Sequence, residues 1–195
     1  MNGLTCRTTG SKLRMSLKMA GMALGGSLLL VGPRSDGQGN DGRAPDLTGP
    51  LAILVPQEGN KVHFHVYAIG VQIYHWNGAL GTWGTSTPEA LLYDADGNLV
   101  GHHYAGPTWE SNSGSLVKGT RLQGVAVNTN DIPWLLLKGR DQAGKGIFTS
   151  VTYIQRLYTS GGVAPSTPGS FDGQEARVPY TAQYFFYRAD PTLAQ

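Results

Sequence analysis

Alternation of apolar and polar residues with a period of two recurs along the chain from about residue 50 onward. Such alternation, or a short run of β-branched and aromatic residues, predicts β-strands with one buried face. The segments with these patterns are residues 51–55, 62–76, 90–93, 99–104, 116–127, 133–138, 147–157 and 178–187. No segment carries a convincing helical period. The pattern therefore predicts an all-β, single-domain β-sandwich or flattened barrel of about seven to nine mostly antiparallel strands.

Local details of these segments predict further geometry. Gly70 interrupts an otherwise bulky run, which favours a bulge or bend there. Residues 94–98, with the sequence DADGN, are typical of a hairpin turn between two of the predicted strands. Alternation along residues 147–157 predicts one face with Val151, Tyr153, Gln155 and Leu157, and an opposite face with Thr152, Ile154, Arg156 and Tyr158.

The N-terminal residues 1–32 resemble a secretory signal peptide, although no A-x-A pattern marks the cleavage site. Their four basic residues precede a 14-residue apolar run, and no acidic residue accompanies them. A membrane-spanning helix needs roughly 17–25 apolar residues, and this run is shorter. A retained N-terminal anchor is therefore the less favoured alternative. Residues 33–48 are polar and rich in glycine, which predicts a flexible linker. We expect a β domain over residues 49–190 in an exported, periplasmic or extracellular protein without a transmembrane span.

Charge and cysteine content argue against several classes of function. Without the four basic residues of the N-terminal segment, 11 basic residues remain against 13 acidic ones, a net charge of −2. No basic run remains to neutralise phosphates, so we expect no nucleic-acid partner. The single cysteine, Cys6, lies in the predicted signal. The remainder therefore has no thiol for catalysis, a disulfide or a metal site. Separately, we expect a monomer.

Five strings in the predicted domain resemble the DUF3455 family of uncharacterised, often exported bacterial and fungal proteins. They are GVQIYHW at 70–76, HYAGPTWESNSGS at 103–115, IPWLLL at 132–137, VTYIQRLYTSGGVAP at 151–165 and VPYTAQYFFY at 178–187. The resemblance covers nearly the whole predicted domain. It implies export, but it implies no activity, so no catalytic residue is carried over from it.

A group of histidines is the first candidate site. Strand alternation puts His63 and His65 on one face, opposite the apolar face of Val62 and Phe64. Two imidazoles at this spacing can chelate zinc or copper, and His103 could complete the site if the fold brought it near. The alternative is a half-exposed sheet face that carries polar aromatic side chains.

The second candidate site centres on Trp109 and Glu110, which follow a Gly-Pro turn. An exposed indole beside a carboxylate would suit a glycan or another small ligand, and His103 and Arg156 are added to this ligand-binding hypothesis. The alternative is that Trp109 belongs to the core and Glu110 pairs with an arginine. Arg156 lies in an apolar strand and needs a partner if it is buried, for which Glu110 or Glu175 would serve.

No motif for catalysis stands out. The chain has no G-x-S-x-G nucleophile elbow, no dinucleotide-binding glycine motif and no distinguished pair of carboxylates. We therefore expect an exported, non-catalytic binding protein of the cell envelope or extracellular space, with a glycan, a small molecule or a protein as partner. The alternatives are a histidine-based metal-binding protein or metal-dependent enzyme, and a structural envelope protein.

Overall fold

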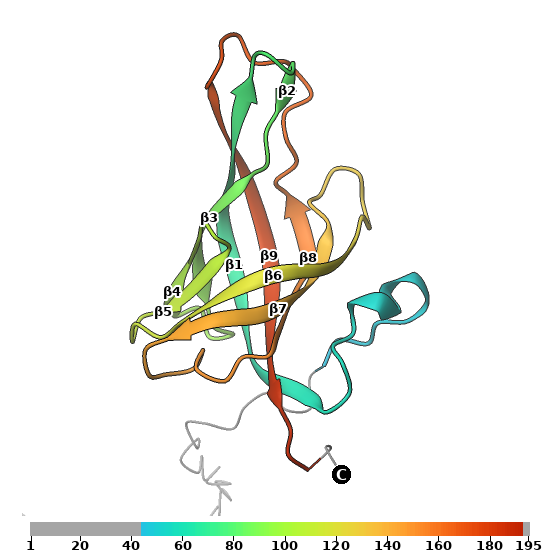
Figure 1. The fold of residues 1–195 in the computed structure, drawn as a ribbon, viewed down its shortest axis with the longest axis vertical. Helices are drawn as coiled ribbons and strands as arrows, with labels where there is room; N and C mark the ends of the chain where they lie inside the picture. Colours follow the sequence, from blue (N-terminus) through green and yellow to red (C-terminus); the bar gives the residue numbers. More distant parts are fainter. Residues whose placement is uncertain (1–43, 193–195) are drawn as a thin grey trace, which may run out of the picture. The chain divides into compact units, whose positions relative to one another are not determined.

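The computed structural model describes residues 44–192, which form nine β-strands and one short 3-10 helix (Figure 1). The predicted signal peptide and most of the predicted linker lie outside these residues. In chain order the elements are η1 (Gly49–Leu54), β1 (Asn60–Asn77), β2 (Thr82–Trp83), β3 (Thr87–Tyr93), β4 (Leu99–Tyr104), β5 (Thr108–Ser111), β6 (Leu116–Val125), β7 (Trp134–Ala143), β8 (Tyr153–Gly161) and β9 (Glu175–Ala189). No helix among the described residues is long and apolar enough to cross a membrane.

The strands form one antiparallel sheet that closes on itself. Each strand from β3 to β9 pairs with its neighbour in sequence, and β1 pairs with both β3 and β9 (Figure 1). Strand β2 pairs only with the last residues of β1 and lies outside this ring. The all-β prediction is thus confirmed, and the closed pairing makes the fold a barrel. Closure gives residues 67–73 of β1 and most of residues 180–187 of β9 strand partners on both sides.

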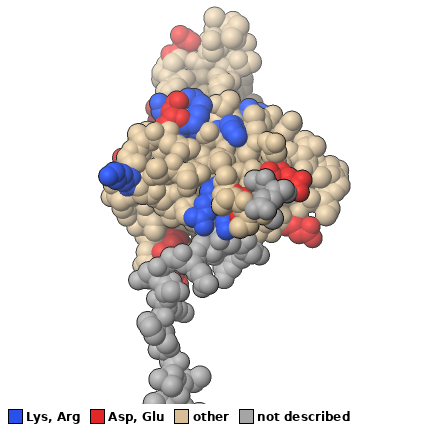
Figure 2. Space-filling model, turned by 60° about the horizontal axis from the view of Figure 1, so that its bottom comes forward, with Lys and Arg blue, Asp and Glu red and all other residues tan. Residues whose placement is uncertain are grey.

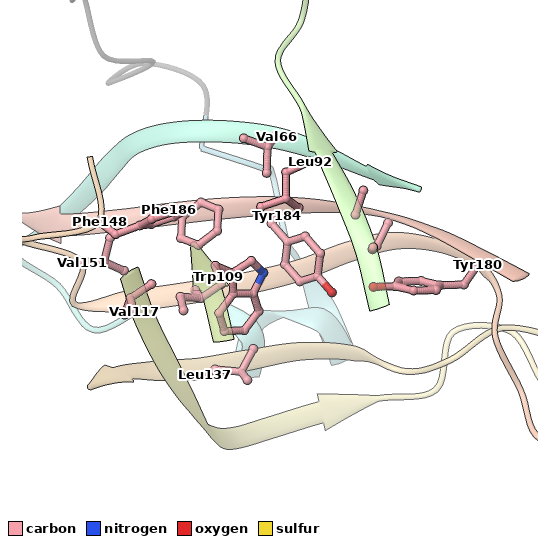
Figure 3. Packing of buried hydrophobic residues seen from close by; sticks show 14 of the residues in the cluster. Val66, Leu92, Trp109, Val117, Leu137, Phe148, Val151, Tyr180, Tyr184 and Phe186 are labelled. Atoms are coloured by element: carbon pink, nitrogen blue, oxygen red, sulfur yellow. The ribbon is translucent and has the colours of Figure 1, made fainter. Parts of the chain in front are cut away.

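Large aromatic and aliphatic side chains fill the interior of the ring (Figure 3). Trp109 is 1% exposed and packs edge to face against Tyr184 and Phe186, with ring centroids 5.3 and 5.9 Å apart. Gly119 makes room for the indole, because a Cβ atom there would lie 3.0 Å from the Trp109 ring. The interior is therefore a packed core over much of its length rather than an open channel.

A second cluster covers the outer face of β8 and β9. Leu47 and Leu54 pack there against residues such as Leu157 and Phe185. The Gln155 side-chain amide, on the same outer face, donates a 2.7 Å hydrogen bond to the Leu54 carbonyl. One prediction is wrong here, and one residue of the predicted linker is buried. Residues 51–55 do not form a strand, because η1 occupies most of them, and Leu47 is buried although it lies in the predicted linker.

The register of β1 differs from the simple alternation that the sequence suggests. A register shift between Val62 and Phe64 puts Val62 in the outer cluster and Phe64 against the interior cluster, so these residues do not share a face. Gly70, predicted as a bulge or bend, instead pairs regularly with Ala90 and Tyr180. A Cβ atom on Gly70 would lie only 2.2 Å from the Glu89 carbonyl oxygen, so close strand approach explains this glycine.

The predicted faces of the 147–157 segment are confirmed for Tyr153, Ile154 and Leu157. Tyr153 and Leu157 belong to the outer cluster, whereas Ile154 belongs to the interior cluster. Strand β8 begins only at Tyr153, and Val151 packs in the interior although it was predicted to share the face of Tyr153. Tyr158, predicted to share the face of Ile154, instead contacts Phe185 of the outer cluster.

Candidate ligand-binding pocket

One end of the barrel interior contains a pocket of about 360 Å³, which we call the interior pocket. The connections from β1 to β3, from β4 to β5 and from β6 to β7 contribute to its lining. In a ring of consecutive antiparallel strands these alternate connections lie at the same end. The lining residues that carry the argument below are Gln72, His103, Trp109, Arg121, Arg156 and Tyr184.

An aromatic wall forms one side of the interior pocket. The rings of His103 and Trp109 stack with centroids 4.3 Å apart and planes at 9°, and Tyr184 packs edge-on against both. His103 Nδ1 donates a 2.8 Å hydrogen bond to the Thr108 carbonyl, which makes Nε2 the acceptor nitrogen of the neutral ring. Burial lowers the pKa of His103 to about 3, so the ring is neutral at neutral pH.

Several buried polar atoms at the interior pocket have no hydrogen-bond partner among the described residues. They are Nε2 of Gln72, Nε1 of Trp109 and the hydroxyl of Tyr184, which line the pocket, and the hydroxyl of Tyr180, which is next to Tyr184 but outside the lining; these side chains are 1–2% exposed. Figure 3 shows the two hydroxyls pointing toward each other and the Trp109 nitrogen turned toward Tyr184. Buried polar groups are normally paired, so a concentration of unpaired ones at a single pocket calls for an explanation.

The Tyr180 hydroxyl interacts with Tyr184 and Gln72, and the Tyr184 hydroxyl interacts with Tyr180 and Arg156, but none of these pairs forms a hydrogen bond of normal geometry. Burial raises the pKa of both tyrosines, and the neighbouring Tyr184 hydroxyl raises the pKa of Tyr180 further. The positive charge of Arg156 acts in the opposite direction on the pKa of Tyr184. Both hydroxyls therefore stay protonated at neutral pH and remain able to donate.

Arg156 reaches the interior pocket from β8 and is half-buried. Its Nε and Nη2 groups donate to the Pro133 carbonyl over 3.2 and 2.9 Å. Neither Glu110 nor Glu175 pairs with it, contrary to the prediction. Within residues 44–192, Arg156 forms no ion pair with any carboxylate.

The protein family can be assigned at this point, because one family matches residues 38–188, most of the chain, with the description "Protein of unknown function (DUF3455)". The chain belongs to the DUF3455 family. No curated protein and no solved structure gives a significant match. Every residue that lines the interior pocket lies within the DUF3455 match.

The DUF3455 fold separates the two central residues of the predicted ligand site. Trp109 and Glu110 lie on strand β5 rather than on a loop tip, so their side chains point to opposite faces. The expectation of an exposed indole is wrong, since Trp109 is 1% exposed. Glu110 is on the outer face, where the Tyr104 hydroxyl donates a 2.8 Å hydrogen bond to it. Trp109, His103 and Arg156, three of the four residues of the ligand hypothesis, line the interior pocket together.

The histidines of the metal hypothesis do not converge. His65 stacks on Phe185 of the outer cluster with ring centroids 4.1 Å apart, and its Nε2 lies 3.0 Å from the Gln183 side-chain oxygen. His103 lies on the inner face of the sheet, and His63 sits at the register shift of β1. Across residues 44–192 no group of three or more histidine or acidic side chains is placed to hold a metal ion.

A larger and more open groove of about 920 Å³ lies on the outer face of β1, β3, β4 and β5. Its charged groups already have partners: Arg177 pairs with Glu89 over 2.6 Å and with Glu175 over 3.4 Å. On the face that Figure 2 shows, described basic and acidic side chains are scattered among uncharged ones. The interior pocket is the better candidate, because buried polar atoms of Gln72, Trp109 and Tyr184 have no hydrogen-bond partner there.

Sequence reasoning missed Gln72 and Tyr184 as pocket residues, and Tyr180 as the neighbour of Tyr184. Gln72 carries a usable signal, because it is a polar residue at an inward position of an apolar run, and it is 2% exposed. The tyrosines carry no such signal, since aromatic residues also occupy the outward positions of β9.

Proposed function

We propose that this DUF3455 protein is a non-catalytic binding protein that holds a small molecule in the interior pocket. The observation that carries the proposal is the convergence of unpaired polar atoms from Gln72, Trp109 and Tyr184 on that pocket. Each buried polar group without a partner costs about 1–3 kcal/mol of stability. A ligand that pairs with these groups would recover this free energy, which gives a physical reason for their presence.

Size and surface chemistry support a small ligand. Pockets for small molecules commonly enclose about 300–1,000 Å³, and the interior pocket lies at the lower end of that range. Apolar side chains such as Leu135 and Ile132 line it together with the aromatic wall. A few convergent polar groups on a mainly apolar surface are the usual composition of such sites.

The chemistry of the lining supports binding over catalysis. General acid–base catalysis works best with a pKa near the operating pH, whereas the pKa of His103 is lowered to about 3. The lining residues include no aspartate, glutamate or cysteine. The signal-like composition of residues 1–32 supports a function in the periplasm or outside the cell.

A thermal-shift screen of the full chain tests this proposal. The panel contains monosaccharides, amino acids, carboxylic acids and their amides, together with zinc and copper salts. A compound at about 100 times its dissociation constant adds about 2.7 kcal/mol, which corresponds to a melting shift of several degrees. We expect a compound that shifts the wild type to lose its effect in Gln72→Leu and Tyr184→Phe but not in Tyr104→Phe, whose hydroxyl lies on the outer face.

Two results would contradict binding in the interior pocket. One is a panel without any stabilising compound. The other is a stabilising compound whose effect survives both Gln72→Leu and Tyr184→Phe. A melting shift with zinc or copper alone would also contradict the proposal and would favour a histidine-based metal-binding protein.

A further inference from the structure

The lining of the interior pocket carries positive charge and no negative charge. From this charge we infer the class of ligand, and the inference rests on the proposed function. Two guanidinium groups, Arg121 and Arg156, line the pocket, and no carboxylate does. Neither arginine forms an ion pair among residues 44–192. A half-buried cation in an apolar strand without a counter-ion is costly, so a negative ligand would be held there more tightly than a neutral one.

Arg156 is oriented to serve as the anion-binding group. The Pro133 carbonyl accepts from Nε and Nη2, which holds the planar guanidinium in place and leaves Nη1 for another acceptor. Its charge reaches into the pocket, because it lowers the pKa of both His103 and Tyr184. A fixed guanidinium fork suits a carboxylate in particular, since both groups are planar and can form parallel hydrogen bonds.

The unpaired polar atoms of the pocket are mostly donors. The indole nitrogen of Trp109 and the amide nitrogen of Gln72 can only donate, and the Tyr184 hydroxyl is a protonated donor. The Gln72 side-chain oxygen already accepts a 2.7 Å hydrogen bond from Ser86. A ligand that satisfies this set must bring acceptors. A carboxylate supplies acceptors only, whereas each hydroxyl of a sugar brings a donor as well.

Besides the hydroxyl groups of Tyr74, Thr85, Ser86 and Thr87, the lining has an apolar part that suits a hydrocarbon body. Pro107, Ile132, Leu135 and Leu137 contribute to it, and they offer no acceptor side chain. An inorganic anion would engage the donors but leave this apolar surface unused. The combination of clustered donors and apolar walls favours an organic anion over sulfate or phosphate.

We propose that the interior pocket binds a small carboxylic acid in its ionised form, with an apolar or aromatic body. The carboxylate accepts hydrogen bonds from Arg156, Tyr184 and the Trp109 indole. The body lies against Pro107 and Leu135. Arg121, which is exposed, adds positive charge to the same pocket.

Isothermal titration calorimetry of the full chain with matched pairs of probes tests this inference. The pairs are benzoate with benzamide and cinnamate with cinnamamide, and sodium sulfate serves as the inorganic anion. We expect at least one carboxylate to bind at least about tenfold more tightly than its amide, as one hydrogen bond to a charged group implies. Arg156→Gln should abolish this preference, and Arg177→Gln on the outer groove should preserve it.

Each outcome separates this inference from the proposed function. If an amide binds as tightly as its carboxylate and Tyr184→Phe weakens both, the pocket binds small molecules but the anion inference is wrong. If sulfate binds as tightly as the carboxylates, the inference that the ligand has an organic body is wrong. If no probe binds, the anion inference fails, whereas the proposed function fails only if the thermal-shift panel also contains no stabilising compound. If Arg156→Gln does not fold, Arg121→Gln replaces it, because Arg121 is exposed. We expect that variant to lose carboxylate affinity by a few-fold, and high salt should lower the affinity of the wild type in the same way.

Discussion

The two ends of the barrel interior differ in how completely their side chains satisfy one another. At one end, Phe64, Phe148 and Phe186 pack together with ring centroids 4.4–5.1 Å apart, and we call this the phenylalanine end. At the other end, the interior pocket collects Gln72 and Tyr184 with unpaired polar atoms. Both ends are built from the same strands, so strand pairing alone does not explain the contrast. Packing serves stability at the phenylalanine end, whereas the pocket end keeps groups that cost stability.

The largest expected effect comes from the phenylalanine end. Phe186→Ala removes a ring that is 0% exposed, so we expect the free energy of unfolding to fall by about 3–5 kcal/mol. Urea unfolding measures it. Phe171→Ala is the control, because Phe171 is 66% exposed and its replacement should change stability by less than about 0.5 kcal/mol. Similar losses from both substitutions would mean that the phenylalanine end is not the stabilising core.

Acid should destabilise the pocket end through His103. The pKa of His103 is lowered from 6.5 to about 3 on folding, so the unfolded chain binds more protons between these values. This contribution is complete above pH 6.5 and is lost as the pH falls toward 3, with a slope of up to about 1.4 kcal/mol per pH unit.

Chemical denaturation across that range, in wild type and His103→Asn, measures the slope. Asparagine removes the titrating ring and keeps a donor for the Thr108 carbonyl. His102→Asn is the matched control, because His102 is exposed on the opposite face of the same strand. If the His103 variant keeps the wild-type slope, burial of a neutral imidazole is not the cause.

The Tyr184 hydroxyl tests whether the unpaired polar groups of the pocket end cost stability. Tyr184→Phe removes a buried hydroxyl without a hydrogen-bond partner, so we expect the ligand-free protein to gain about 1 kcal/mol in the free energy of unfolding. Tyr74→Phe is the matched control, since the Tyr74 hydroxyl donates a 2.7 Å hydrogen bond to the Gly162 carbonyl. That variant should lose about 1 kcal/mol. A loss in Tyr184→Phe would show that its hydroxyl already contributes to the fold.

The smallest expected effect lies outside the barrel, one residue from the indole. Glu110→Gln should change the free energy of unfolding by less than about 0.5 kcal/mol, because Glu110 points to the outer face. The hydrogen bond to Glu110 raises the pKa of Tyr104, so the variant should return that pKa toward its ordinary value. Ultraviolet difference titration follows the phenol. A large loss of stability or of ligand binding in Glu110→Gln would place Glu110 in the site after all.

The contrast between the ends could be predicted only in part. Runs of alternating residues located most of the strands, because a sheet with one buried face imposes a period of two on its sequence. The same rule failed at Val62, where the register shift moved the side chain to the outer face. A different rule failed at Trp109, whose exposure was predicted from the preceding Gly-Pro turn. Such a turn predicts a change of chain direction, but it does not show whether the strand that follows is buried.

The sequence by itself determined the β class of this protein, most of its strands and the DUF3455 assignment, since these depend on local periodicity and on unusual strings of residues. Only the tertiary structure decided that the sheet closes and which polar groups meet inside it. Pairing of β1 with β9 places Gly70 beside Tyr180, so that Gln72 and Tyr180 become neighbours across a long stretch of chain. No local pattern records such a contact, because closing the ring requires two strands from opposite ends of the domain.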